Sequence, residues 1–263
     1  MPSLCPGEGL PLEAAYVAKA RILATRFFPT VTPNPSLLNS PSEEPKPPFP
    51  FELGVTEGDI SNILYSASPW KAPGPDGLPI GFLKTLGSPF RKILAVIGEA
   101  SLRLSHFPAP FKTATVVVLP KPGKTPAQKE LAGAWRPISL LNCMGKILET
   151  LIAKRLIEVV EDNGLLPEGQ FGNRKGRSTE VAIRFLTVAV RTAWAWGGLA
   201  SLLQLDLKGA FDTVHHMILL ATLKALGTPQ GVLNWLQSYL QDRKADLSFD
   251  GQTTSFIVFS GVP

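Results

Sequence analysis

The residues best suited to chemistry lie in one ten-residue stretch, from Leu203 to Asp212. Asp206 follows the apolar run Leu199–Leu205, which predicts a central strand with the carboxylate at its end. Phe211 comes five positions later, ahead of a predicted helix. Carboxylate oxygens suit Mg²⁺, and two such ions about 3.5–4 Å apart stabilise the attacking and leaving oxygens of phosphoryl transfer. A lone aspartate at a strand end is more often a helix cap or an ion-pair partner, so this stretch needs support from elsewhere.

Charge gives part of that support. The 263 residues carry 26 Lys and Arg against 21 Asp and Glu, a net charge of +5. Between Lys112 and Arg184 there are 12 basic and 7 acidic residues, and the rest of the chain has 14 of each, so the whole excess lies in one central segment. A concentrated positive charge favours a polyanionic partner.

The composition also excludes several classes of protein. Two cysteines and three histidines are too few for a disulfide framework or a zinc quartet. No run of about 18 apolar residues could span a membrane, and no signal peptide precedes Leu12. We therefore expect an intracellular protein without a membrane partner.

The elements that must position the candidate residues are helices and short strands in mixed order, which predicts an α+β fold. Hydrophobic spacing of 3–4 residues predicts helices at 13–28, from Thr56 onward, and at 78–86, 89–104, 143–162, 178–195, 213–226 and 229–241. Apolar or β-branched runs predict strands at 115–119 and 199–205, while 138–141 fits a short strand or the entry to a helix. Asp250-Gly251 predicts a hairpin between 245–249 and 254–259. Eight prolines within 29–50 predict an extended linker, and 68–77 must be a loop.

Six sequence blocks, in order, resemble the reverse transcriptase of non-LTR (LINE-type) retrotransposons. The resemblance runs from about Phe51 to Pro263. Each block alone is a weak or moderate signal, whereas six in the family's order make chance agreement very unlikely. The blocks are Lys71-Ala72-Pro73-Gly74-Pro75-Asp76-Gly77, Leu119-Pro120-Lys121-Pro122-Gly123-Lys124, Trp135-Arg136-Pro137-Ile138-Ser139-Leu140-Leu141, Gln170 through Thr179, the Asp206 stretch, and Ser260-Gly261-Val262-Pro263.

The resemblance implies a nucleotide site. Lys121 and Arg136 match positions that meet the incoming triphosphate, where a guanidinium grips phosphate oxygens as a fork. Ala210 and Phe211 match the nucleotide-binding pair, whose aromatic ring leaves no room for a 2′-hydroxyl and so selects deoxynucleotides.

It also implies a metal and a template. Asp206 matches the first carboxylate for Mg²⁺ and is the implied catalytic residue, and Leu207 would offer its backbone carbonyl to the same ion. Arg174, Lys175 and Arg177 stand beside glycines and suit phosphate contacts with a template strand. We expect Asp212 to cap the following helix rather than to bind metal. The implied partners are an RNA template, a DNA primer and deoxynucleoside triphosphates.

By resemblance, the chain would be the fingers and an incomplete palm of a right-hand polymerase, with helices packed on a small mixed or antiparallel sheet. The expected segments are an N-terminal helix and Pro-rich linker (1–50), an N-terminal extension (51–110), fingers (111–198) and a partial palm (199–263).

Two motifs of the family are absent from the sequence. The Gln-Gly-Ser that follows Ser-Gly-Val-Pro and the aromatic-Ala-Asp-Asp hairpin do not occur. Since one carboxylate cannot assemble a two-metal site, we expect this chain alone to be inactive, as a truncated or decayed copy. The alternatives are a non-catalytic nucleic-acid-binding remnant, a sequence without function and, less well supported, a mobile-intron reverse transcriptase.

Overall fold

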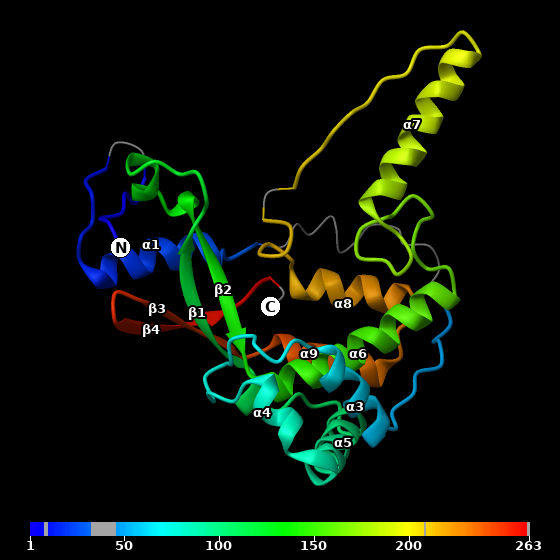
Figure 1. Cartoon of the computed structure of the whole chain (residues 1–263), viewed down its shortest axis with the longest axis horizontal. Helices are drawn as coiled ribbons and strands as arrows, with labels where there is room; N and C mark the ends of the chain where they lie inside the picture. The colour runs from blue at the N-terminus through cyan, green and yellow to red at the C-terminus, as the bar shows by residue number, and fades with distance from the viewer. Residues whose placement is uncertain (8–9, 33–45, 208, 262–263) are drawn as a thin grey trace. The chain divides into compact units, whose positions relative to one another are not determined.

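The computed structural model describes residues 1–7, 10–32, 46–207 and 209–261 (Figure 1). Helices and a four-stranded mixed sheet make up the fold, which confirms the α+β class. The chain divides into two compact units: residues 1–152 with 209–263, and residues 153–208. These units are defined by compactness in space, whereas the four segments expected from the sequence are functional parts of a polymerase. The four segments therefore stay a prediction.

The sheet of the first unit has the strand order β2-β1-β3-β4. β1 (Thr113–Pro120) pairs antiparallel with β2 (Trp135–Leu141) and parallel with β3 (Arg243–Phe249). β3 continues through the predicted Asp-Gly turn into antiparallel β4 (Gln252–Val258). Side chains alternate between the two faces of the sheet, so its two faces have different surroundings.

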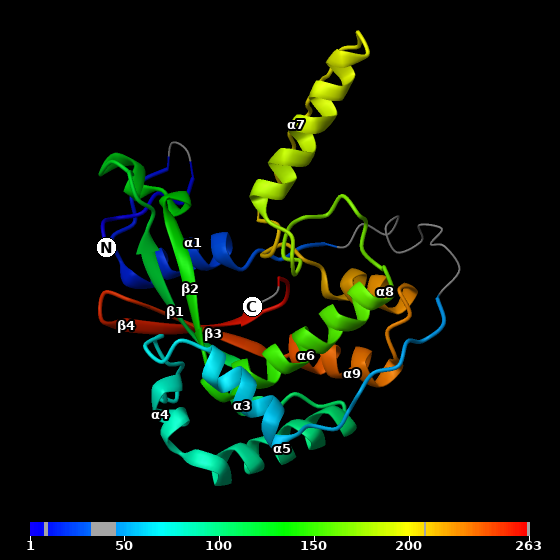
Figure 2. The ribbon, with the colours of Figure 1, turned by 45° about the vertical axis from the view of Figure 1, so that its right-hand side comes forward.

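One face of the sheet packs on α1 (Tyr16–Phe27). The shared core contains Leu23 and Phe27 of the helix together with Val116 and Leu247 of the strands. The Tyr16 ring lies 4.6 Å from the Phe249 ring. In the views of Figures 1 and 2, α1 runs beside the strands, consistent with this packing. The helix therefore forms part of the support of the sheet.

The first unit also contains a group of helices that pack against one another. It comprises α3 (Glu57–Ser66), α4 (Ile80–Thr85), α5 (Gly87–Arg103), α8 (His216–Ala225) and α9 (Gln230–Leu240), of which α3, α5 and α9 lie together in Figure 2. Thr56 and Asp59 form a capping box that starts α3, as its sequence predicts. Buried Trp235 of α9 donates its indole N–H to Ser101 of α5 at 2.9 Å. Short 3₁₀ turns, Ala109–Phe111, Ala127–Glu130 and Ala132–Ala134, flank β1 and β2.

The second unit contains the end of α6 (Cys143–Asp162) and all of α7 (Thr179–Ala195). The Ser178 hydroxyl accepts a hydrogen bond from the amide of Val181 and so caps α7. Gly164, with φ of +58°, follows the end of α6. Both helices agree with the prediction, and 138–141 proves to be part of β2.

Two local predictions were wrong. Leu199–Leu205 forms no strand; the run is irregular and exposed. A strand forms only where a neighbour takes its backbone hydrogen bonds, and within the described ranges no segment pairs with this run. Asp212 does not cap α8, because the helix begins at His216 and Asp212 lies in a turn before it. Most of the predicted proline-rich linker, residues 33–45, lies outside the described residues.

Candidate functional site

The β1–β2 hairpin brings the two predicted triphosphate-binding cations to the same end of the sheet. Leu119 pairs with Arg136, and Lys121 comes directly after the last pair, Pro120 with Trp135. The Lys121 ammonium donates to the carbonyl of Gly133 at 2.7 Å, which closes the hairpin loop. Lys121 is thus held by the loop that it closes.

Arg136 has a different environment. Its neighbour Trp135 is buried in the core shared with α1, and alternation along β2 turns Arg136 to the opposite face. The side chain is exposed there, on the same face as its partner Leu119. The guanidinium is therefore placed to reach a ligand outside the protein.

Three of the six motif blocks meet around one pocket of about 340 Å³ in the first unit. Pro137 and Ser139 contribute from β2, Asp212 from the turn before α8, and Gly261 from the segment after β4. Apolar strand residues and the end of α1 form most of the remaining walls; they include Phe27, Phe28, Ala114, Val116, Ala245 and Val258. Three blocks that are far apart in the sequence thus lie close together in the fold.

Backbone contacts hold two sides of this pocket together. The Gly261 amide donates to the carbonyl of Val214 at 2.8 Å, and His216 Nε2 lies 2.7 Å from the Gly261 carbonyl. Gly261 has φ of +82°, and a Cβ atom there would lie 2.9 Å from the Asp212 carbonyl oxygen. Only glycine fits this position without a shift of the backbone. Phe211, which is exposed, comes directly before Asp212 in the sequence and so lies next to this contact.

A buried polar cluster lies beside the pocket. The Arg243 guanidinium donates to the Tyr239 carbonyl at 2.9 Å and lies 4.7 Å from the centre of the Tyr239 ring. Burial raises the pKa of the Glu149 carboxyl, and a hydrogen bond with Tyr239 opposes that shift. Burial likewise raises the pKa of the Tyr239 hydroxyl and lowers that of Arg243. Because Arg243 also lines the pocket, this cluster supports the pocket wall.

The predicted metal ligands Asp206 and Leu207 lie in the second unit, on the exposed irregular run. Lys121, Arg136 and Phe211 lie in the first unit. Mg²⁺ and Ca²⁺ take six or more oxygen ligands. Among the described residues, no group of three or more His, Cys, Asp or Glu side chains is placed to hold a metal ion. These residues by themselves do not fit a divalent metal, and we derive no chemical step through one.

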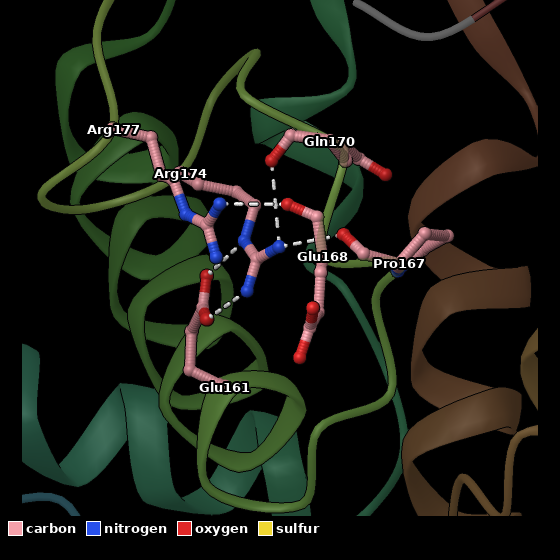
Figure 3. Close-up of polar contacts among 6 residues, drawn as sticks. All are labelled: Glu161, Pro167, Glu168, Gln170, Arg174 and Arg177. Atoms are coloured by element: carbon pink, nitrogen blue, oxygen red, sulfur yellow. Dashed lines mark hydrogen bonds and ion pairs between the residues drawn. The ribbon is translucent and has the colours of Figure 1, made fainter. Parts of the chain in front are cut away.

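The predicted template-binding cations Arg174, Lys175 and Arg177 share one loop of the second unit, between α6 and α7, and Figure 3 shows the contacts of Arg174 and Arg177. Arg174 forms a two-pronged ion pair with Glu161, with its Nε 2.8 Å and its Nη2 2.6 Å from the carboxylate oxygens. Its Nη1 donates to the carbonyls of Pro167 at 2.8 Å and Gln170 at 3.4 Å. The side chain is 8% exposed. Arg174 is therefore engaged by the protein itself.

The other two cations of this loop are more open. Arg177 donates one N–H to the Glu168 carbonyl at 2.7 Å, and its guanidinium lies 5.2 Å from the centre of the Phe171 ring. Lys175 is exposed, and no hydrogen bond or ion pair of its ammonium is seen with any part of the chain that the structure describes. The loop thus presents Lys175 and part of Arg177 to solvent.

Residues 119–263, more than half of the chain, match the family described as reverse transcriptase (RNA-dependent DNA polymerase). The chain belongs to the reverse transcriptase family. It is 34% identical over 93% of its length to the probable RNA-directed DNA polymerase from transposon BS of Drosophila melanogaster, and 32% identical over 93% to the RNA-directed DNA polymerase from mobile element jockey of the same species. A putative 115 kDa protein of its type-1 retrotransposable element R1DM is 33% identical over 93%. The resemblance to non-LTR retrotransposon reverse transcriptases is confirmed.

The chain spans about a quarter of the length of these curated relatives, 27% of the first two and 22% of the third. No helix in the described parts of the chain combines the length and the apolar character needed to cross a membrane.

Reasoning from the sequence missed the acidic partner of the loop between α6 and α7. Glu161 and Asp162 end α6, where the negative end of the helix dipole disfavours acidic residues. Two acids in that position indicate a nearby cation. That signal could have marked Glu161 as an ion-pair candidate, but it does not identify Arg174 as the partner.

It also missed the role of the Pro-Gly-Pro-Asp-Gly block. Asp76 accepts a hydrogen bond from the Asn142 side chain at 2.5 Å, and Asn142 Oδ1 in turn accepts from the amides of Met144 and Gly145 at 2.9 and 3.2 Å. Asn142 thus caps the start of α6, and the loop buttresses that cap.

Proposed function

We propose that the chain is the part of an RNA-directed DNA polymerase that holds the template RNA and the incoming deoxynucleoside triphosphate, within a longer retrotransposon protein. The observation that carries this proposal is the family match of residues 119–263. It is supported by the meeting of Lys121 and Arg136 at one end of the β1–β2 hairpin. In the terms of a right-hand polymerase, 111–198 would be the fingers and 199–263 part of the palm, after a linker segment (1–50) and an N-terminal extension (51–110).

For the nucleotide, we assign Arg136 as the main grip on the triphosphate. Its exposed guanidinium can donate two parallel hydrogen bonds to phosphate oxygens. Lys121 would add a second positive charge at the same end of the hairpin. Ala210 and Phe211 would face the sugar, and the Phe211 ring, 64% exposed, would exclude a 2′-hydroxyl by its bulk.

For the metal, Asp206 and the backbone carbonyl of Leu207 are proposed as part of a Mg²⁺ site in the complete polymerase, with Asp206 as its catalytic carboxylate. Carboxylate and carbonyl oxygens are ligands that Mg²⁺ prefers. The further ligands would have to come from residues other than those described, and we assign the ion no step.

For the template, the loop between α6 and α7 is the proposed phosphate-binding surface. Lys175 and Arg177 expose positive charge beside Gly176, and phosphate contacts hold a strand without reading its sequence. Arg174 belongs to the same loop, with its side chain bound to Glu161.

Nucleotide binding tests the proposal. The RNA template and DNA primer are annealed to each other and bound to the whole chain. A fluorescent deoxynucleoside triphosphate is titrated with this complex, and the matching monophosphate is titrated in parallel. Arg136→Ala should weaken triphosphate binding about tenfold, because charge-assisted bonds to phosphate are lost, and should leave monophosphate binding almost unchanged. Lys92→Ala, which removes an exposed cation of α5, is the control and should change neither. Equal triphosphate affinity in the Arg136 and Lys92 variants would contradict the proposed site.

A further inference from the structure

Arg174, Lys175 and Arg177 lie in the loop between α6 and α7, here called the template loop, and their side chains differ in how far the protein already binds them. All three guanidinium nitrogens of Arg174 donate hydrogen bonds within the protein: two to Glu161 and the third to the carbonyls of Pro167 and Gln170 (Figure 3). A phosphate would have to displace an ion pair that is already bidentate and largely shielded from solvent. Arg174 is therefore poorly placed to bind the template.

The same contacts define the shape of the loop. Arg174 joins the last turn of α6, through Glu161, to two carbonyls of the chain that follows it. Asn173 and Gly176, on either side, have φ of +55° and +74°. Such left-handed conformations are uncommon outside glycine and persist where surrounding contacts hold them. We call Arg174 with its contacts to Glu161, Pro167 and Gln170 the clamp; Arg174 itself lies between these two left-handed residues.

We propose that Arg174 and Glu161 form a positioning pair, which shapes the loop so that Lys175 and Arg177 meet the template phosphates. This inference rests on the proposed binding of template RNA by the loop. It assigns Glu161, an acidic residue, a favourable part in binding a polyanion. Neither Glu161 nor Arg174 would touch the RNA.

Aromatic contacts extend the clamp to Arg177. Its guanidinium lies over Phe171, and the Phe171 ring is 6.1 Å from the Phe185 ring of α7. With one N–H donated to the Glu168 carbonyl, Arg177 retains other N–H groups for phosphate. The loop is thus tied to α6 by Arg174 and to α7 by Phe171, with Lys175 between the two ties.

The charges on the pair are consistent with a permanent clamp. Hydrogen bonding from Arg174 holds the pKa of the Glu161 carboxyl below its ordinary value, and Glu161 raises the pKa of Arg174. Both groups are therefore ionised at neutral pH. Replacing Glu161 by Gln keeps the size of the side chain, removes its charge and replaces one of the two oxygens that accept from Arg174 by an NH2 group.

The decisive experiment uses the sign of the effect of Glu161→Gln on RNA affinity, measured by fluorescence anisotropy with a labelled single-stranded RNA and the whole chain. If Arg174 bound phosphate directly, E161Q would release it and remove a negative charge, and RNA would bind more tightly. If the pair positions the loop, E161Q should weaken binding about fivefold through loss of the charge-assisted bonds. Tighter or unchanged binding would overturn the inference.

A matched control separates the clamp from simple charge. Glu158 lies one turn earlier on α6 and is exposed, so Glu158→Gln makes the same change of charge outside the clamp and should tighten binding slightly. Arg174→Lys keeps the positive charge without the planar fork and should weaken RNA binding as E161Q does; retained affinity would count against the pair. Should E161Q fail to fold, as judged by circular dichroism, Glu161→Asp decides the question: it keeps the charge but shortens the reach to Arg174, and it should weaken RNA binding only if the pair positions the loop.

A third variant distinguishes failure of the inference from failure of the proposed RNA surface. The double change Lys175→Ala with Arg177→Ala should weaken binding and reduce the slope of log K against log salt by about 1.4, two phosphate contacts on a single strand. If this variant binds like wild type, the loop is not the RNA surface and the inference falls with it. If it binds weakly while E161Q binds tightly, only the positioning role is wrong.

Discussion

Asp76 and Asn142, 66 positions apart in the sequence, are joined by a 2.5 Å hydrogen bond between a loop carboxylate and a helix-capping amide. The bond connects the Pro-Gly-Pro-Asp-Gly block to the junction of β2 and α6. Asn142 is buried, so its amide needs a partner once it leaves water. The block therefore has a structural part in the fold besides any contact with nucleic acid.

Breaking this bond should lower the free energy of unfolding. We expect Asp76→Ala to cost about 1–2 kcal/mol, because it leaves a buried donor unpaired. The reciprocal change, Asp76→Asn with Asn142→Asp, keeps a donor facing an acceptor and an aspartate at the cap, and should recover most of the loss. Urea unfolding followed by circular dichroism measures both. A swapped variant no more stable than D76A would show that the bond is not the source of the effect.

Gly74 gives an independent test of the same junction. A Cβ atom there would lie 2.4 Å from the Leu141 carbonyl carbon and 2.5 Å from the Asn142 amide nitrogen. Gly74→Ala should therefore force the loop away from β2 and cost about 2–3 kcal/mol, the range of an overpacked site. Gly133→Ala is the control, since nothing lies within 4 Å of a Cβ at Gly133. Equal melting temperatures for the two variants would contradict the close packing.

Local signals in the sequence predicted most of the elements. The predicted bounds of α6, 143–162, coincide with those observed, because a sustained apolar face and Gly164 after it determine a helix without reference to the rest of the chain. The same holds for the Asp250-Gly251 turn, which joins β3 to β4 as expected. Thr56 at the start of α3 is a third case of a purely local signal.

Features that depend on distant partners were not predictable in this way. Leu199–Leu205 has the composition of a buried strand, but a strand needs a neighbour for its backbone. The Glu161–Arg174 clamp spans 13 residues and two kinds of structure, and spacing alone does not pair them. The motif order identified the family, whereas the pocket shared by Ser139, Asp212 and Gly261 is visible only in three dimensions.

The Glu161–Arg174 pair should make stability depend on pH at the acid end. The pKa of Glu161 is lowered in the folded chain from an ordinary value of 4.5. Its contribution to stability is therefore fully present above about pH 4.5 and is lost as the pH falls through the folded pKa. Thermal unfolding of wild type and E161Q between pH 3 and 7 measures this. The difference in melting temperature should shrink on acidification, and a difference that grows towards pH 3 would reverse the assigned sign.

The buried guanidinium of Arg243 provides the last prediction. Arg243 is 6% exposed and is held by the Tyr239 carbonyl and ring, with the Glu149 carboxyl as its electrostatic partner. Removing one member of a buried charged cluster leaves the other uncompensated, so Arg243→Ala should cost about 3 kcal/mol. Lys244→Ala, at the next position and exposed, should change the free energy of unfolding by less than about 0.5 kcal/mol. The double variant R243A with Glu149→Gln should lose less than R243A alone, since it removes the stranded carboxylate as well. If adding Glu149→Gln to R243A lowers stability further, the two residues do not form one cluster.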